Sequence, residues 1–140
     1  SNSFHIVKKL SLGANLVNIG RGFMFTVGCI QALNCHTNKC PTGVASTDPR
    51  RYHAISIKHK SRHVVNFHRH TINALLELSG AMGVSELQQH SADNIHYRTH
   101  EGQPKTLADL YHFIEPGDLL GEKIHPAYET DWLQSRSDAF

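Results

Sequence analysis

The chain has 140 residues, a formal net charge of +2 and 39% hydrophobic residues, a composition typical of an ordinary globular domain. The weak net charge, without a basic run, argues against nucleic acid as a partner. No apolar stretch approaches the ~18 residues of a membrane span, and nothing resembles a signal peptide. Three cysteines, an odd number, fit a reducing compartment, so we expect a cytoplasmic protein.

The first part of the chain predicts a helix, a strand, a glycine turn and a second helix. Phe4–Leu12 has helical spacing, with Gly13 as the stop. Asn15–Ile19 is an apolar run that suits a buried strand, and Phe23–Leu33 follows as the next helix. A parallel strand needs neighbours to pair its backbone groups. We therefore expect α/β architecture, with the strand's partners in sequence outside this chain.

The rest of the chain predicts mainly helix. The longest helix is expected over Ser61–Met82, with an apolar surface wide enough to be packed between other elements. Thr106 and Asp109 have the spacing of a capping box at the start of a helix. The other expected elements are a loop over Cys35–Asp48, a short extended piece over Ala54–Ile57, and helices over Ser85–Gln89 and Leu107–Ile114.

All three cysteines lie within twelve positions, spaced C-x5-C-x4-C, as Cys29, Cys35 and Cys40. A single free cysteine is usually a buried apolar side chain, but three so close together favour a soft metal centre. For zinc, His36 would have to be the fourth ligand, but it is adjacent to Cys35, and the first spacing misses the usual zinc knuckle. An iron–sulfur cluster tolerates wider spacing, and Cys-Pro, here with Pro41, recurs at such sites. We favour an iron–sulfur cluster.

Two further patterns leave their alternatives open. Gly20-Arg21-Gly22 is either a tight strand-to-helix turn or a place where backbone N–H groups and the Arg21 cation receive a phosphate. His59 and His63 lie four residues apart, and His68-x-His70 follows, a pattern that chelates a divalent ion in some helices. Solvated or packed histidines are the favoured interpretation, because the zinc-protease pattern H-E-x-x-H is absent.

These residues together resemble a known family. The stretch LGANLVNIGRGFMFTVGCIQALNCHTNKCPTGVASTDPRR is similar to the late part of the FMN-binding synthase domain of glutamate synthase and its single-domain relatives. The resemblance implies that Cys29, Cys35 and Cys40 ligate a [3Fe-4S] cluster and that Gly20 and Arg21 receive the FMN phosphate. It continues more loosely through RHVVNFHRHTINALLEL and LADLYHFIEPGDLL.

The resemblance also implies the architecture. The family's domain is a (β/α)8 TIM barrel, which takes about 250 residues. Residues 1–48 would hold its last helix, strand and helix with the cysteine loop, and residues 49–140 a mainly helical C-terminal extension. Catalytic residues would lie upstream, so we assign none here and expect the chain by itself to be inactive.

The resemblance implies a reaction and partners as well. The complete enzyme would form glutamate from 2-oxoglutarate and the nitrogen of ammonia or glutamine. Its electrons would come from ferredoxin or from an NAD(P)H-linked subunit. Two alternatives stay open: a subunit of an N-methylglutamate synthase, and a non-enzymatic interaction module stabilised by zinc.

Overall fold

A computed structural model describes residues 2–100, 102–121 and 124–138. The chain divides into two compact units, Ser1–Ser91 and Ala92–Phe140. The described residues are rich in helix and contain one small two-stranded sheet. This composition is consistent with a piece of an α/β protein.

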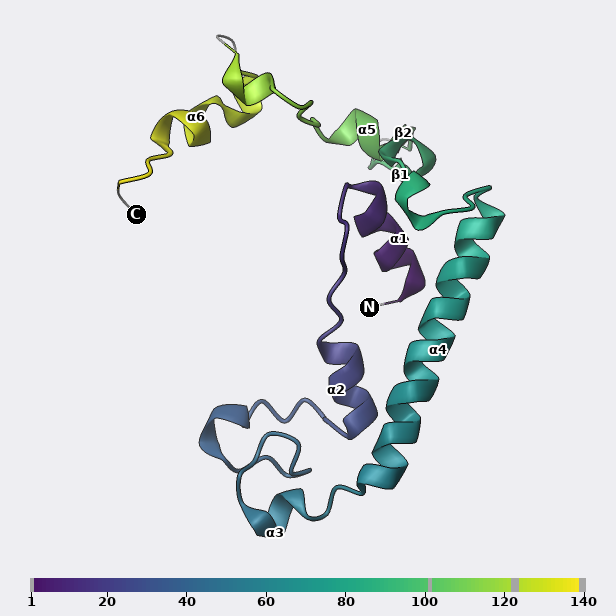
Figure 1. The fold of residues 1–140 in the computed structure, drawn as a ribbon, viewed down its shortest axis with the longest axis vertical. Coiled ribbons are helices and arrows are strands. Elements are labelled where there is room, and N and C mark those ends of the chain that lie inside the picture. The colour runs from purple at the N-terminus through teal and green to yellow at the C-terminus, as the bar shows by residue number, and fades with distance from the viewer. Residues whose placement is uncertain (1, 101, 122–123, 139–140) are drawn as a thin grey trace. The chain divides into compact units, whose positions relative to one another are not determined.

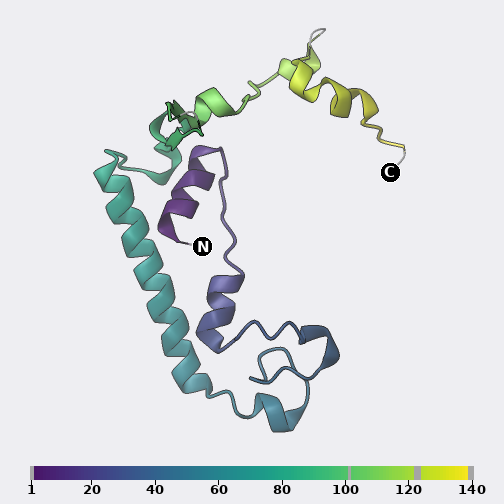
Figure 2. The same cartoon turned by 180° about the vertical axis from the view of Figure 1, so that it is seen from behind.

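The first unit is built around one long helix. The unit's α-helices are α1 (Ser3–Ser11), α2 (Arg21–Val27), α3 (Pro49–Tyr52) and α4 (Ile57–Ala81), and its 3-10 turns are η1 (Cys35–Thr37) and η2 (Leu87–Gln89). Both α1 and α2 pack against α4 (Figures 1 and 2). The long helix thus holds the two earlier ones in place.

Helix α1 lies where its sequence predicts, shifted by one residue. The N-cap is Asn2, whose side chain accepts the His5 N–H. The Ser3 hydroxyl donates to the Thr71 carbonyl of α4 at 3.2 Å. Gly13, at φ +93°, follows the helix as expected.

The predicted strand over Asn15–Ile19 is not formed in this chain. These residues run as an irregular connection between α1 and α2, as Figure 1 shows, and Leu16 is 88% exposed. The prediction of a buried strand is therefore wrong for the chain by itself. The physical reason is that a strand exists through its hydrogen-bonded neighbours, and no described residue pairs with this segment.

Two helical boundaries and one extended segment also differ from expectation. Helix α2 stops at Val27 instead of continuing to Leu33, because Gly28 adopts φ +110° and turns the chain out of the helix. Helix α4 begins four residues earlier than predicted, since the Ser56 hydroxyl caps it by accepting the His59 N–H. The expected extended piece over Ala54–Ile57 is consequently a turn leading into α4.

Close packing between α2 and α4 depends on Gly22. A Cβ built on Gly22 would lie 2.7 Å from Phe67 Cζ and 3.0 Å from Ile19 Cγ2. The Phe67 ring is itself held edge-on against Phe23, with ring centroids 5.0 Å apart. The ring therefore has little freedom to move away.

We expect Gly22→Ala to lower the unfolding free energy of the full-length protein by about 1–3 kcal/mol, the usual cost of overpacking. The matched control is Gly80→Ala in α4, where an added Cβ meets nothing within 4 Å. The control should be neutral or stabilising by up to about 1 kcal/mol, through helix propensity alone. Denaturant unfolding of both variants measures the difference, and equal effects would show that the α2–α4 contact is looser than described.

The second unit contains a short hairpin that sequence reasoning missed. Strands β1 (His96–Arg98) and β2 (Pro104–Thr106) pair antiparallel, with His96 opposite Thr106. The capping box is confirmed, because the Thr106 hydroxyl accepts the Asp109 N–H and the Asp109 carboxylate accepts the Thr106 N–H. The helix it opens, α5 (Leu107–Leu110), is half the predicted length. The remaining elements are η3 (Ala92–Asn94), η4 (Asp118–Leu120) and α6 (Pro126–Gln134).

Among the described residues, even the 25-residue α4 lacks the apolar content that a membrane-crossing helix needs.

Candidate metal centre

The three cysteines line one pocket of the first unit. Cys29, Cys35 and Cys40 contribute to it from the segment after α2, from the start of η1 and from the following loop. None forms a disulfide, and their exposure falls from Cys35, which is exposed, to Cys40, which is buried. The remaining lining is mostly apolar and consists of Met24, Ile30, Ala32, Leu33, Asn34, Pro41, Thr42, Val44 and Ala45.

The end of α2 fixes the backbone at Cys29. The Cys29 N–H donates to the Met24 carbonyl and the Gly28 N–H donates to the Phe25 carbonyl, both at 3.0 Å. These two bonds, with Gly28 in the left-handed region, make a Schellman motif. The first cysteine is thereby held on a defined helix end.

The segment between the first and third cysteines carries unusual backbone. Among the described residues, the non-glycine positions with positive φ are Gln31 at +55°, Leu33 at +58° and Asn38 at +60°. All three lie between Cys29 and Cys40. Such conformations cost of order 1–3 kcal/mol each, less for Asn, and cluster at functional sites. The turn at Gln31 brings its backbone N–H to 3.5 Å from Cys29 Sγ.

Cys40 lies in a tight turn that favours its thiolate. Its Sγ lies 3.5 Å from Thr42 Oγ1, and its carbonyl accepts the Gly43 N–H at 3.2 Å. Hydrogen bonds, chiefly from the Thr42 side chain and then from the Ala45 backbone, lower the pKa of the Cys40 thiol from 9.0 to about 7, against the opposing effect of burial. Since the thiolate is the form that binds a metal, this environment suits a ligand.

Asn38 closes the loop that presents Cys40. Its Oδ1 accepts hydrogen bonds from the Thr47 N–H at 2.7 Å and from the Ser46 hydroxyl at 3.0 Å. Its carbonyl also accepts from the Ser46 hydroxyl at 2.9 Å. The two ends of the loop are thus tied together by one side chain in the left-handed conformation. Asn is one of the few residues that adopts this conformation at low cost.

Two cations approach the cysteine loop from α3 and α4. The Arg51 Nη1 donates to the Cys40 carbonyl at 3.4 Å. A Cβ built on Gly28 would lie 3.2 Å from Lys60 Nζ, so the amine sits beside the residue that precedes Cys29. Both cations therefore lie against the backbone of the cysteine loop.

Sequence reasoning named the cysteines but missed the groups around them. No sequence motif marks these groups, because their places depend on backbone turns and on the packing of α4 against α2. They are Gln31, Asn38, Thr42 and Lys60. The candidate histidines of α4, His59, His63, His68 and His70, are all exposed. In the described ranges no set of three or more His, Cys, Asp or Glu side chains is placed to hold a single metal ion.

The glycine turn lies at the N-terminus of α2. Gly20 is the N-cap, and no side chain caps the helix, unlike α1 and α4. A Cβ on Gly20 would meet nothing within 4 Å, and the Arg21 side chain is exposed. Gly20 and Arg21 therefore face open space, whereas Gly22 faces the Phe67 ring.

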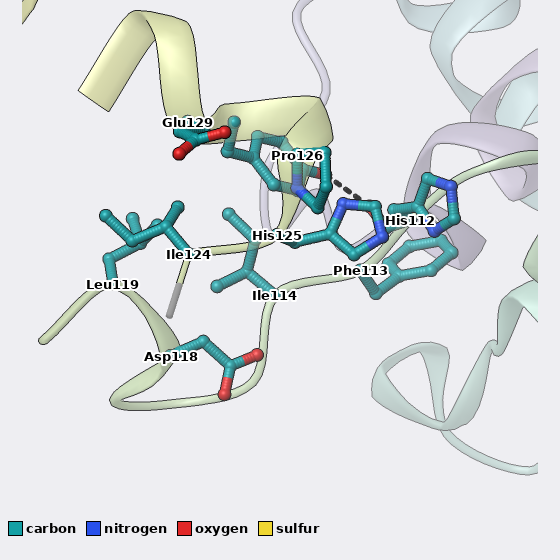
Figure 3. A pocket seen from close by; sticks show the side chains of 10 residues that line it. His112, Phe113, Ile114, Asp118, Leu119, Ile124, His125, Pro126 and Glu129 are labelled. Carbon is teal, nitrogen blue, oxygen red and sulfur yellow. Dashed lines mark hydrogen bonds between the residues drawn. The ribbon is translucent and has the colours of Figure 1, made fainter. Parts of the chain in front are cut away.

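A larger pocket lies in the second unit, with a volume of about 660 Å³ (Figure 3). Two of its polar side chains are engaged locally: His125 Nδ1 accepts the Ala127 N–H at 3.1 Å, and Asp118 Oδ2 accepts the Glu115 N–H at 2.9 Å. The Tyr128 hydroxyl donates to the His112 carbonyl. These bonds cap α6 and shape the preceding turns, so the pocket offers little directed chemistry.

Comparison with known proteins gives a consistent picture. The family described as the conserved region in glutamate synthase matches residues 1–85. The glutamate synthase large subunit-like protein YerD of Bacillus subtilis is 42% identical over 107 residues, which cover 76% of this chain and 20% of that protein. The archaeal-type glutamate synthase [NADPH] of a Thermotoga species is 29% identical over 87 residues, covering 62% of this chain and 17% of that protein. The glutamate synthase [NADH] of Saccharomyces cerevisiae is 26% identical over 122 residues, covering 81% of this chain and 6% of that protein.

The chain spans about a fifth or less of the length of these relatives. No solved structure matches it.

Proposed function

This chain belongs to the glutamate synthase family, and on that premise we propose that it is the part of a flavin- and iron–sulfur-dependent oxidoreductase that binds the iron–sulfur cluster. The complete enzyme would form glutamate from 2-oxoglutarate and the nitrogen of ammonia or glutamine. The observation that carries the proposal is that Cys29, Cys35 and Cys40 line a common pocket within the matched residues.

The number and type of donors suit a [3Fe-4S] cluster, which takes three thiolate ligands, and the three cysteines line one pocket. Among the described residues their side chains are not gathered around a single metal-ion position, and Cys35 is exposed. The Gln31 N–H and the Thr42 hydroxyl lie at hydrogen-bond distance from Cys29 Sγ and Cys40 Sγ, where they would tune the sulfurs. When bound, the cluster supplies one-electron transfer and FMN supplies hydride transfer, while the protein sets position and potential.

For FMN we propose that the phosphate lies at Gly20 and Arg21. The uncapped N-terminus of α2 and the open space at Gly20 support this. The position also agrees with the phosphate site of (β/α)8 barrels, of which residues 1–48 would be the end. In that barrel the irregular Asn15–Ile19 segment would gain its strand partners.

The phosphate site predicts a selective effect of Gly20→Val. Gly20 has φ −81°, which any residue adopts, and a side chain there meets nothing within 4 Å, so the fold should tolerate the change. In the full-length protein the valine side chain should obstruct the close approach of the phosphate to the backbone N–H groups. We expect FMN affinity to fall about tenfold or more, because each lost hydrogen bond to a charged group is worth roughly 1.5–3 kcal/mol. Flavin fluorescence titration measures it.

Two controls accompany this variant. Arg21→Ala should weaken FMN less, since backbone groups would still hold the phosphate, and riboflavin, which has no phosphate, should respond little to either change. Unchanged FMN affinity in a folded Gly20→Val protein with its iron retained would place the phosphate elsewhere.

The proposed function is tested by purifying the full-length protein without air. We expect visible absorbance from flavin and iron–sulfur centres, and glutamate formation from 2-oxoglutarate with ammonia or glutamine. A colourless, zinc-containing protein would favour the interaction module instead. Efficient use of methylamine, giving N-methylglutamate, would favour an N-methylglutamate synthase.

A further inference from the structure

The side chain of Asn38 makes its hydrogen bonds through a single atom. Asn38 Oδ1 accepts the Thr47 N–H at 2.7 Å, the Ser46 hydroxyl at 3.0 Å and the Thr47 hydroxyl at 3.1 Å. Within the described ranges the amide nitrogen of Asn38 makes no such bond. What this side chain contributes to the loop is therefore an oxygen acceptor.

The bonds of Asn38 close a loop around the third cysteine. Residues 39–45 lie between Asn38 and Ser46, and Cys40 is among them. Cys40 is buried although Asn38 and Thr47 are exposed, so the burial of the sulfur depends on the loop staying folded. A single exposed hydrogen bond stabilises little, because water competes for both partners. Three bonds to one oxygen can hold the loop ends together.

The closure continues through α3 and returns to Cys40. Ser46 Oγ accepts the Asp48 N–H at 3.1 Å, and the Asp48 carboxylate caps α3 by accepting the Arg50 N–H at 3.0 Å. From the same helix, Arg51 Nη1 donates to the Cys40 carbonyl at 3.4 Å. A continuous path of contacts thus runs from Asn38 through Ser46 and α3 to Cys40.

The backbone and the side chain of Asn38 contribute separately. Its backbone is left-handed, with φ +60° and ψ +13°, a conformation that glycine adopts at least as readily as asparagine. A glycine would therefore satisfy the turn but could not supply the oxygen. Aspartate would keep an oxygen acceptor and also tolerates this conformation. The two contributions can be separated by substitution.

We propose that Asn38 is a positioning residue for Cys40, whose side-chain oxygen closes the loop before any metal is bound. The role of Cys40 as a metal ligand rests on the proposed function. Ligands are held in place by the hydrogen bonds around them, and changes to such partners typically cost about 10–100-fold in metal affinity.

The test is the rate at which iodoacetamide alkylates Cys40 in the full-length protein freed of metal with a chelator. Trypsin cleaves after Lys39 and after Arg50, so Cys40 lies in a different peptide from Cys35 and the two rates are separated by mass spectrometry. At about pH 9.5 a free thiol is mostly ionised, so the rate reports access to the sulfur rather than its protonation.

Asn38→Gly should raise the Cys40 rate about fivefold or more, because the loop loses its oxygen acceptor and the buried sulfur becomes accessible. Asn38→Asp should stay within about twofold of the unchanged protein, since the acceptor is kept. An Asn38→Gly protein whose Cys40 reacts at the original rate would overturn the proposal. Equal rates for Asn38→Gly and Asn38→Asp would overturn it too.

Two references make the comparison specific to the loop. Cys35 is already exposed, so its own rate should change less than about twofold in every variant. The matched control is Asn66→Ala, which removes the same amide from an exposed position of α4. It should leave the Cys40 rate unchanged, and a rise equal to that of Asn38→Gly would overturn the proposal.

Iron is measured in parallel on protein purified without air, to separate this inference from the proposed function. Asn38→Gly should lose iron to a chelator about tenfold faster, and Asn38→Asp should resemble the unchanged protein. A protein that never contains iron, but whose Cys40 is protected through Asn38, would overturn the proposed function alone. A protein with full iron whose Cys40 rate ignores Asn38→Gly would overturn the role of Asn38 alone.

Discussion

Serine in place of Cys29, Cys35 or Cys40 is expected to remove most of the iron and acid-labile sulfide from the full-length protein purified without air. Each change replaces a thiolate by a hydroxyl, which is protonated at neutral pH and a poor ligand for iron. Changes around a metal site that spare its ligands typically cost 10–100-fold in affinity. Loss of a ligand should therefore cost more, and iron and sulfide analysis measures it.

Two further variants make this prediction sharper. Thr42→Val removes the hydroxyl beside Cys40 Sγ while keeping the ligand, so it should weaken the cluster by about tenfold without abolishing it. His36→Ala should leave the iron content unchanged, although His36 is the candidate fourth ligand of the zinc alternative. Full retention of iron and sulfide in all three Cys→Ser variants would end the cluster hypothesis, and zinc lost on His36→Ala would support the alternative.

The elements that were predictable from sequence are those whose causes are local. Helix α1, the long helix α4 and the capping box of Thr106 and Asp109 follow from periodicity and cap residues, and all three are present. The strand predicted over Asn15–Ile19 is not formed, because a strand depends on partners that are distant in sequence. Its apolar pattern describes a strand inside a sheet, and the described chain holds no neighbour for it.

The candidate site shows the same division. The cysteine spacing predicts Cys29, Cys35 and Cys40 as ligands, and this stays a prediction. The sequence pattern did not indicate the positive φ of Gln31 and Leu33, which turn the backbone between Cys29 and Cys35. Those conformations are held by the surrounding loop rather than by residue preference. The closeness of Lys60 to Gly28 arises only when α4 packs on α2, a contact between segments about thirty residues apart.

The loop itself depends on Gly43, and Gly43→Ala should be among the most damaging single changes in the chain. Gly43 has φ +77°, and a Cβ there would lie 2.3 Å from the Arg51 carbonyl oxygen, a backbone atom of α3 that cannot rotate away. The positive φ alone costs about 1–3 kcal/mol, and the overlap adds to it by forcing α3 away from the Cys40 turn.

We expect Gly43→Ala to lose most of its iron and to become sensitive to trypsin after Lys39, because the turn that carries Cys40 can no longer close against α3. The matched control is Gly83→Ala, which has a similar φ of +73° but meets nothing within 4 Å, so it isolates the cost of the conformation. The control should keep its iron and lose only about 1 kcal/mol of stability. If the two variants match in iron content and in cleavage, the contact between Gly43 and α3 does not hold the cysteine loop, and the loop must be ordered by the rest of the protein.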